Sequence, residues 1–146
     1  MASGKGNTNA AGLLQAIYQA TFSDLSTLLA NSASPLTNLY VSLHTANPGA
    51  GGAQNTSEAA YTSYARVAVA RSTGGWTLSG ETISNASLIS FPTATGGSET
   101  ETYVGIGTSV SGAGTLLWFG ALTSGLAVSS GVSPSVAIGA LTITEA

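Results

Sequence analysis

Short apolar runs separated by glycine, proline and asparagine fill most of this chain, and no other feature of the sequence limits its fold as strongly. The runs have the length of ordinary strands and are rich in β-branched and aromatic residues. Short strands punctuated by turn signals are typical of a β-sandwich or a β-barrel. The sequence therefore predicts a mainly β protein.

The clearest strand is Leu39–His44, in which apolar and polar residues alternate before the turn Asn47-Pro48-Gly49. The alternation places one set of side chains toward a core and the other set away from it, and proline and glycine then stop the ladder. The run 115–122 is apolar on both faces, which predicts a central strand buried on both sides. Further strands are expected at 65–71, 76–78, 82–85, 88–91, 102–107, 126–128, 135–138 and 141–144.

The first 37 residues have a different pattern. Residues 1–6 are small and polar, and we expect them to form a flexible arm. Apolar residues then recur at steps of three and four, which predicts an amphipathic helix, or two helices with a break near Ser23-Asp24. The apolar stripe consists of Leu13, Leu14, Ile17, Tyr18, Thr21, Leu25, Leu28 and Leu29. We expect one structural domain, with the arm and helical segment at 1–37 and the sandwich body at 38–146.

Charged residues make up only 6% of the chain, against roughly a quarter in a typical soluble domain. Three basic residues cannot form the stripe that neutralises phosphates or a basic membrane-surface helix, so we expect no nucleic-acid and no membrane partner. The absence of cysteine excludes disulfides, thiolate nucleophiles and Cys-ligated metals. We also find no signal peptide or stretch of transmembrane length, and expect synthesis in a cytoplasm.

The residues that could carry chemistry are few. His44, the one histidine, would need a nucleophile and an orienting acid to act as a base, and no nucleophile-elbow motif occurs. Glu99 and Glu101 would point the same way in an extended segment and could work on a glycoside or bind a cation, but a solvated loop edge is the stronger interpretation. Arg66 and Arg71 are expected on opposite faces of one strand, each meeting an acid such as Glu58 or Glu81.

We therefore predict no catalytic, cofactor-binding or metal-binding residue and no cofactor. His44, Arg66, Arg71, Glu99 and Glu101 are instead candidate contacts between subunits. The large aromatic residues are expected to fill the core rather than to line a sugar groove. They are Trp76, Phe91, Tyr103, Trp118 and Phe119.

Most of the chain resembles a family of small virion proteins of tailed bacteriophages. The resemblance lies in LHTANPG at 43–49, GGAQNTSEAAYTSYARVAVARSTGGW at 51–76 and GVSPSVAIGALTITEA at 131–146. Members are often labelled tail-fibre-like, and some small head-decoration proteins of similar composition have a jelly-roll fold. The resemblance, together with the turn-punctuated strands, implies a jelly-roll-like antiparallel β-sandwich of about eight strands after one or two N-terminal α-helices.

The resemblance and the missing catalytic constellation predict a structural virion protein and not an enzyme. Our first hypothesis is a capsid decoration, or cement, protein on the head surface, which bridges and stabilises subunits of the major capsid protein as a homo-oligomer, a dimer or trimer. It would be made in the cytoplasm of the bacterial host. The alternatives are a tail or tail-fibre component and a receptor- or carbohydrate-binding module.

Overall fold

The computed structural model describes residues 3–6, 36–79 and 82–144, and these residues form antiparallel β-sheets. The strands are β1 (Ser3–Lys5), β2 (Asn38–His44), β3 (Val67–Ala70), β4 (Trp76–Ser79), β5 (Thr82–Asn85), β6 (Ile89–Ser90), β7 (Ser98–Gly107), β8 (Leu116–Ser129), β9 (Ser135–Val136) and β10 (Thr142–Thr144). No helix occurs within these ranges. The prediction of a mainly β protein is confirmed, whereas the jelly-roll topology stays a prediction.

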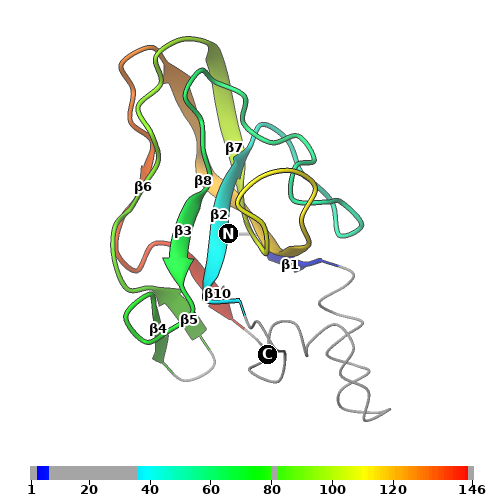
Figure 1. Ribbon diagram of the computed structural model, residues 1–146, viewed down its shortest axis with the longest axis vertical. Coiled ribbons are helices and arrows are strands. Elements are labelled where there is room, and N and C mark those ends of the chain that lie inside the picture. Colours follow the sequence, from blue (N-terminus) through cyan, green and yellow to red (C-terminus); the bar gives the residue numbers. More distant parts are fainter. Residues whose placement is uncertain (1–2, 7–35, 80–81, 145–146) are drawn as a thin grey trace.

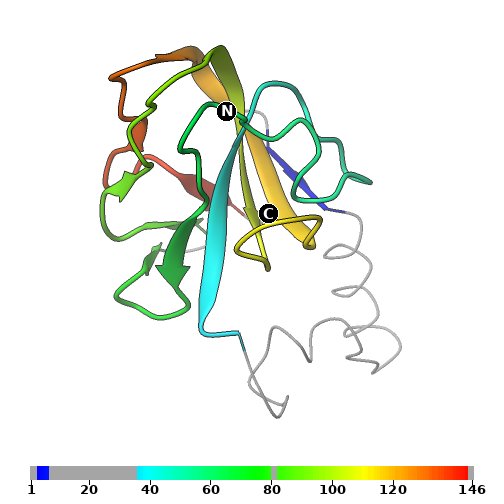
Figure 2. The ribbon, with the colours of Figure 1, turned by 45° about the horizontal axis from the view of Figure 1, so that its top comes forward.

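The strands form three sheets (Figure 1). The largest has five strands in the order β1-β8-β7-β2-β3, the second has the order β10-β5-β4, and the third pairs β6 with β9. Figures 1 and 2 show the third sheet alongside the five-stranded sheet and the β10-β5-β4 sheet at one end of it. All of these strand pairings are antiparallel, and they include pairs of strands that are far apart in the sequence, such as β1 with β8.

The structure describes residues 3–6 and 36–37 of the N-terminal region. The predicted helices lie outside the described residues. The predicted flexible arm is wrong for residues 3–5, because β1 pairs with β8 in the register Gly4 to Phe119. The amide of Gly6 continues this contact by donating to the carbonyl of Leu117 at 3.1 Å. The boundary at residue 38 and the single-domain organisation stay predictions.

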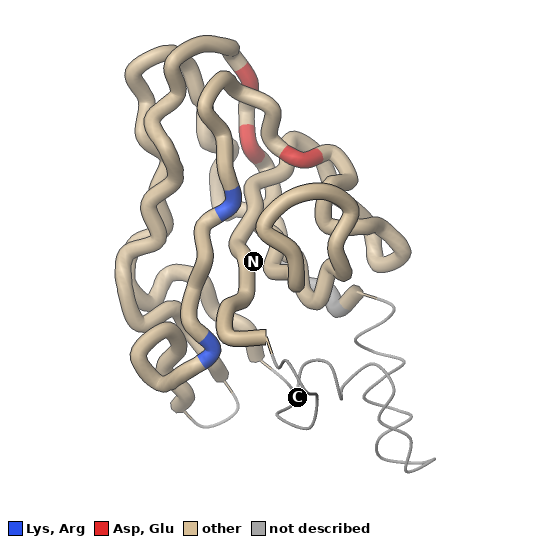
Figure 3. Tube along the Cα trace, in the orientation of Figure 1, with Lys and Arg blue, Asp and Glu red and all other residues tan. Residues whose placement is uncertain are grey.

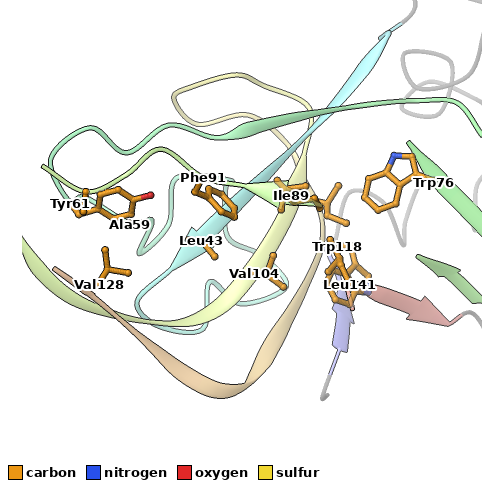
Figure 4. Close-up of a cluster of buried hydrophobic side chains, with 13 residues drawn as sticks. Leu43, Ala59, Tyr61, Trp76, Ile89, Phe91, Val104, Trp118, Val128 and Leu141 are labelled. Atoms are coloured by element: carbon orange, nitrogen blue, oxygen red, sulfur yellow. The ribbon is translucent and has the colours of Figure 1, made fainter. Parts of the chain in front are cut away.

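The core lies on one face of the five-stranded sheet, where the alternation of β2 places Val41 and Leu43. Val41 faces Ile106 on β7, and Ile106 faces Trp118 on β8, so three strands contribute one row of buried side chains. Figure 4 shows this cluster extending to Phe91 and Tyr61 on one side and to Trp76 and Leu141 on the other. The run 116–120 is buried throughout, which confirms the expected central strand.

The two longest strands differ from the sequence-based expectation. We expected separate strands at 115–122 and 126–128, and an exposed loop before residue 102. Instead β7 begins at Ser98 and pairs with β8 along its length, with irregularities between Glu101 and Tyr103 and between Ile106 and Gly107. Gly125 does not end β8, because its missing side chain allows a close approach to Thr100 across the ladder: a Cβ there would lie 3.0 Å from Thr100 Cγ2.

Asn85 connects the smaller sheets to the loop before β10, and its replacement tests how much this connection contributes. Its side-chain amide donates to the carbonyls of Ser87 and Ala137 at 2.8 and 2.9 Å, and its Oδ1 accepts from the amide of Leu141 at 2.9 Å. Asn85 is 1% exposed. Asn85→Ala removes the partner of the buried Leu141 amide and of two carbonyls on exposed residues, and is expected to lower the free energy of unfolding by about 1–3 kcal/mol.

Urea denaturation of Asn85→Ala, compared with the exposed-residue control Ser135→Ala, measures this contribution. The control is expected to stay within about 0.5 kcal/mol of the parent protein. Equal midpoints for the two variants would show that water replaces the Asn85 side chain without loss.

Candidate functional site

Arg66 and Glu58 form a buried ion pair in the described part of the chain. Arg66 is 7% exposed, and its Nε and Nη2 donate to Glu58 Oε1 and Oε2 at 2.6 and 2.7 Å. This is the bidentate geometry in which guanidinium and carboxylate match. The predicted partnership of Arg66 with Glu58 is confirmed.

The same guanidinium holds the loop between β7 and β8. Nη1 of Arg66 donates to the carbonyl of Ser109 at 2.8 Å, and Nη2 donates to the carbonyl of Gly112 at 2.6 Å. Gly112 has φ of +72°, a left-handed conformation that favours glycine at the tip of this loop. A single arginine therefore fixes both the 58–66 segment and the 108–115 loop.

Tyr64 links this ion pair to the main sheet. Its hydroxyl donates to Glu58 Oε1 at 2.9 Å and accepts from the amide of Leu43 on β2 at 3.1 Å. Burial raises the pKa of Tyr64 far above its usual range, and the nearby Glu58 carboxylate acts in the same direction. The Tyr64 hydroxyl therefore stays neutral and able to donate at neutral pH. No motif or spacing in the sequence indicates this role of Tyr64.

On the opposite face of β2 from the core, Ser42 and His44 form a hydrogen-bonded pair. Ser42 Oγ lies 2.9 Å from His44 Nε2, and His44 Nδ1 lies 2.9 Å from the carbonyl of Thr56. A carbonyl only accepts, so the imidazole proton sits on Nδ1, and Nε2 accepts from the serine hydroxyl. Burial lowers the pKa of His44, which keeps the ring neutral.

A serine donating to a histidine is also the arrangement of nucleophile and base in hydrolases. Here both residues are 0% exposed, and the ring nitrogen away from the serine binds a backbone carbonyl rather than an acid. Gly105 lies against the pair, since a Cβ there would come within 2.5 Å of His44 Nε2. The side chains of Ser42 and His44 are therefore covered by the fold, next to the neighbouring strand β7.

The buried side-chain amide of Gln54 also connects the loops at 45–58 and 108–115 to strand β2. Gln54 is 0% exposed, and its Nε2 donates to the carbonyl of Tyr40 at 3.0 Å while its Oε1 accepts from the amide of Ser109 at 3.1 Å. Gly107 leaves room for it, because a Cβ at that position would lie 2.3 Å from Gln54 Cδ. The loops at 45–58 and 108–115 are thus fixed to the sheet by buried polar side chains.

The expected solvated loop edge at Glu99 and Glu101 is wrong, because both residues lie on β7. Glu99 Oε1 accepts from the amides of Ala60 and Tyr61 at 2.8 and 2.7 Å. Glu101 is 0% exposed, and neither of its carboxyl oxygens has a hydrogen-bond partner in the described part of the chain. Burial, and then the neighbouring Glu99 carboxylate, raise the pKa of Glu101 to about 8, so the group is mainly protonated at neutral pH.

Arg71 does not share the environment of Arg66. Its Nη1 donates to the carbonyl of Leu36 at 2.7 Å and its backbone amide donates to the carbonyl of Thr37 at 2.9 Å, so it holds the chain that enters β2. Glu81, the other acid expected as a partner for these two arginines, lies outside the described residues. Contacts of His44, Arg66, Arg71, Glu99 and Glu101 with another subunit stay a prediction, but in this chain His44, Arg66 and Glu101 are buried by their own fold.

An open apolar groove of about 510 Å³ lies where the five-stranded sheet meets the β10-β5-β4 sheet. Both tryptophans of the chain line it, and Figure 4 shows them at one end of the core cluster. Leu78 also lines it and is 71% exposed. Among the described residues that line the groove, Arg71 is the only charged one. The other apolar side chains are Leu39, Ile83, Ile106, Leu117 and Ile143.

Charge is sparse along the described chain, as Figure 3 shows. Within residues 3–6, 36–79 and 82–144, no group of three or more His, Cys, Asp or Glu side chains is placed to hold a metal ion. A search of the same residues finds no helix with the length and hydrophobicity needed to cross a bilayer.

Comparison with known protein families gives one match. The family model described as podophage GP4 fiber I protein gp80 matches residues 15–144, which is 130 of the 146 residues. A search of curated proteins gives no match.

Proposed function

Because this chain belongs to the podophage GP4 fiber I protein gp80 family, we propose that it is a structural component of a fibre on the virion of a tailed bacteriophage. The family match over nearly the whole chain carries this proposal. It supports the tail-fibre alternative from the sequence over head decoration, since the family is named for a fibre.

The geometry of the described residues supports a structural role. Arg66 and Gln54 fix the connecting loops to the sheet through buried hydrogen bonds, so the surface that the loops present is held in one shape. A pre-organised surface loses little conformational entropy when it packs against another protein. The small number of charged residues also limits repulsion between copies packed side by side.

We propose that the protein acts without catalysis and as a homo-oligomer, a dimer or a trimer. The Ser42–His44 pair is the closest approach to a catalytic arrangement among the described residues, and both side chains are fully buried. Closed cyclic symmetry is the usual solution for identical subunits, and a fibre component needs a defined number of copies around its axis.

Electron cryo-microscopy of the virion tests the proposed location. The expected result is density for this chain in appendages attached to the tail, in a small number of copies set by the symmetry of the tail. Hundreds of copies on the head lattice would overturn the proposal and would support head decoration, with the major capsid protein as the partner. The absence of this chain from complete virions of the parent phage would overturn both structural roles.

A further inference from the structure

We propose that the apolar groove between the five-stranded sheet and the β10-β5-β4 sheet binds residues 7–35 of the same chain, through the apolar stripe that the sequence predicts there. The inference is independent of the role of the protein in a fibre. It assigns a binding surface on the body and a partner for it, so it can fail while the fibre proposal holds.

Both ends of the 7–35 segment are attached to residues that line the groove. At one end the amide of Gly6 donates to the carbonyl of Leu117 at 3.1 Å. At the other end Arg71 Nη1 donates to the carbonyl of Leu36 at 2.7 Å. Leu117 and Arg71 both belong to the lining of the groove. Gly6 and Leu36, the described residues on either side of the segment, are therefore each hydrogen-bonded to a residue of the groove lining.

The length of the segment fits this path. The apolar stripe runs from Leu13 to Leu29, and a helix of that length extends for about 25 Å. The residues on either side, 7–12 and 30–35, form connectors that can each span roughly 20 Å when extended. A helix held by two such connectors stays close to the groove, where its local concentration far exceeds that of a second molecule in dilute solution.

The chemistry of the two surfaces is complementary. The stripe on the segment is formed mainly by leucine, and the groove is lined mainly by aliphatic and tryptophan side chains. Asp24 is the one charged residue in 7–35, and Arg71 is the one charged residue among the described lining. In addition, the indole Nε1 of Trp76 is buried with no acceptor among the described residues, which a Ser, Thr or carbonyl oxygen of the segment can provide.

Tryptophan fluorescence tests the proposal directly, because Trp76 and Trp118 are the only tryptophans in the sequence and both line the groove. The test variant of the full chain carries Leu25→Asp with Leu28→Asp, which places two charges on the apolar stripe. The control carries Ser23→Asp with Ser26→Asp, the same charges on the opposite side of the predicted helix. We expect a red-shifted emission and a several-fold rise in acrylamide quenching for the test variant alone.

A photo-crosslink identifies the segment that occupies the groove, and it places no charge on the apolar stripe. Benzoylphenylalanine at position 25 of the full chain is expected to crosslink to peptides containing residues 71–78 or 141–144, and the same probe at position 23 is not. Mixing ¹⁴N- and ¹⁵N-labelled protein before irradiation distinguishes the source. Crosslinks within one isotope support the proposal. Mixed-isotope crosslinks, which would place a second copy in the groove, or crosslinks to other peptides only, would overturn it, as would equal fluorescence of the two aspartate variants.

Discussion

Arg66→Ala is expected to lower the free energy of unfolding by about 3–5 kcal/mol, the largest loss we anticipate from a single substitution in this chain. The change removes both hydrogen bonds to Glu58 and leaves a largely buried carboxylate without its counter-charge. It also removes the two donors that hold the carbonyls of Ser109 and Gly112. Breaking a buried ion pair from one side is costly because the remaining charge stays desolvated.

Guanidinium chloride denaturation measures the free energy of unfolding of Arg66→Ala, with Arg71→Ala as the matched control. Arg71→Ala removes a half-buried arginine that donates to one carbonyl through its side chain, and should cost only about 1 kcal/mol. The double variant Glu58→Gln with Arg66→Met should be more stable than Arg66→Ala, because it leaves no unpaired charge. A loss below about 1 kcal/mol for Arg66→Ala would show that the ion pair contributes no more than a surface pair.

Glu101→Gln is expected to make the protein more stable at alkaline pH, by on the order of 3–5 kcal/mol at pH 8. The pKa of Glu101 is raised from its usual value of 4.5 to about 8 in the folded protein. Between these two values the unfolded chain has lost the proton that the folded chain keeps. The stabilisation from Glu101 is therefore fully present below pH 4.5 and is lost as pH rises to about 8, by at most about 1.4 kcal/mol per pH unit.

The difference in free energy of unfolding between Glu101→Gln and the parent protein isolates the contribution of the Glu101 carboxyl. His44 contributes with the opposite sign, since its lowered pKa costs stability as pH falls below 6.5, but it is common to both proteins. Thermal or urea unfolding from pH 4 to pH 9 should show the two proteins nearly equal in stability at the acidic end and separating as pH rises. A constant difference across this range would mean that Glu101 is ionised throughout in the folded state.

Glu99→Gln provides the control for the neighbouring charge. The substitution keeps an oxygen that can accept from the amides of Ala60 and Tyr61 but removes the negative charge that raises the pKa of Glu101. In the parent sequence carrying Glu99→Gln, the loss of stability with rising pH should therefore end at a lower pH and be smaller in total. An unchanged profile would leave burial as the whole cause of the shift.

Local pattern predicted much of the fold. Alternation along Leu39–His44 and the apolar run before Leu122 correctly placed β2 and the buried first half of β8. Such patterns are informative because burial of one or both faces leaves a direct trace in the sequence. The pairing of Arg66 with Glu58 was also predictable, since a chain with three basic residues offers few partners to a buried acid.

The remaining features depend on contacts between distant segments. Nothing in the composition of residues 98–101 indicates a strand, because Gly96-Gly97 and two glutamates are typical of an exposed turn. They form part of β7 because β8 pairs with them and the amides at 60 and 61 bind Glu99. The roles of Tyr64 and Gln54 likewise arise from hydrogen bonds to residues more than ten positions away. Only the alternation that puts Ser42 and His44 on one strand face could have indicated their pairing.

The buried position of the Arg66–Glu58 pair bears on how this protein responds to ionic strength. Mobile ions screen exposed charges over about 10 Å at 0.1 M salt, but they do not enter a pair that the fold covers. With only nine charged residues in 146, little of the folding free energy rests on exposed charges that salt could weaken. We therefore expect the stability of the body to change little between dilute and saline solution.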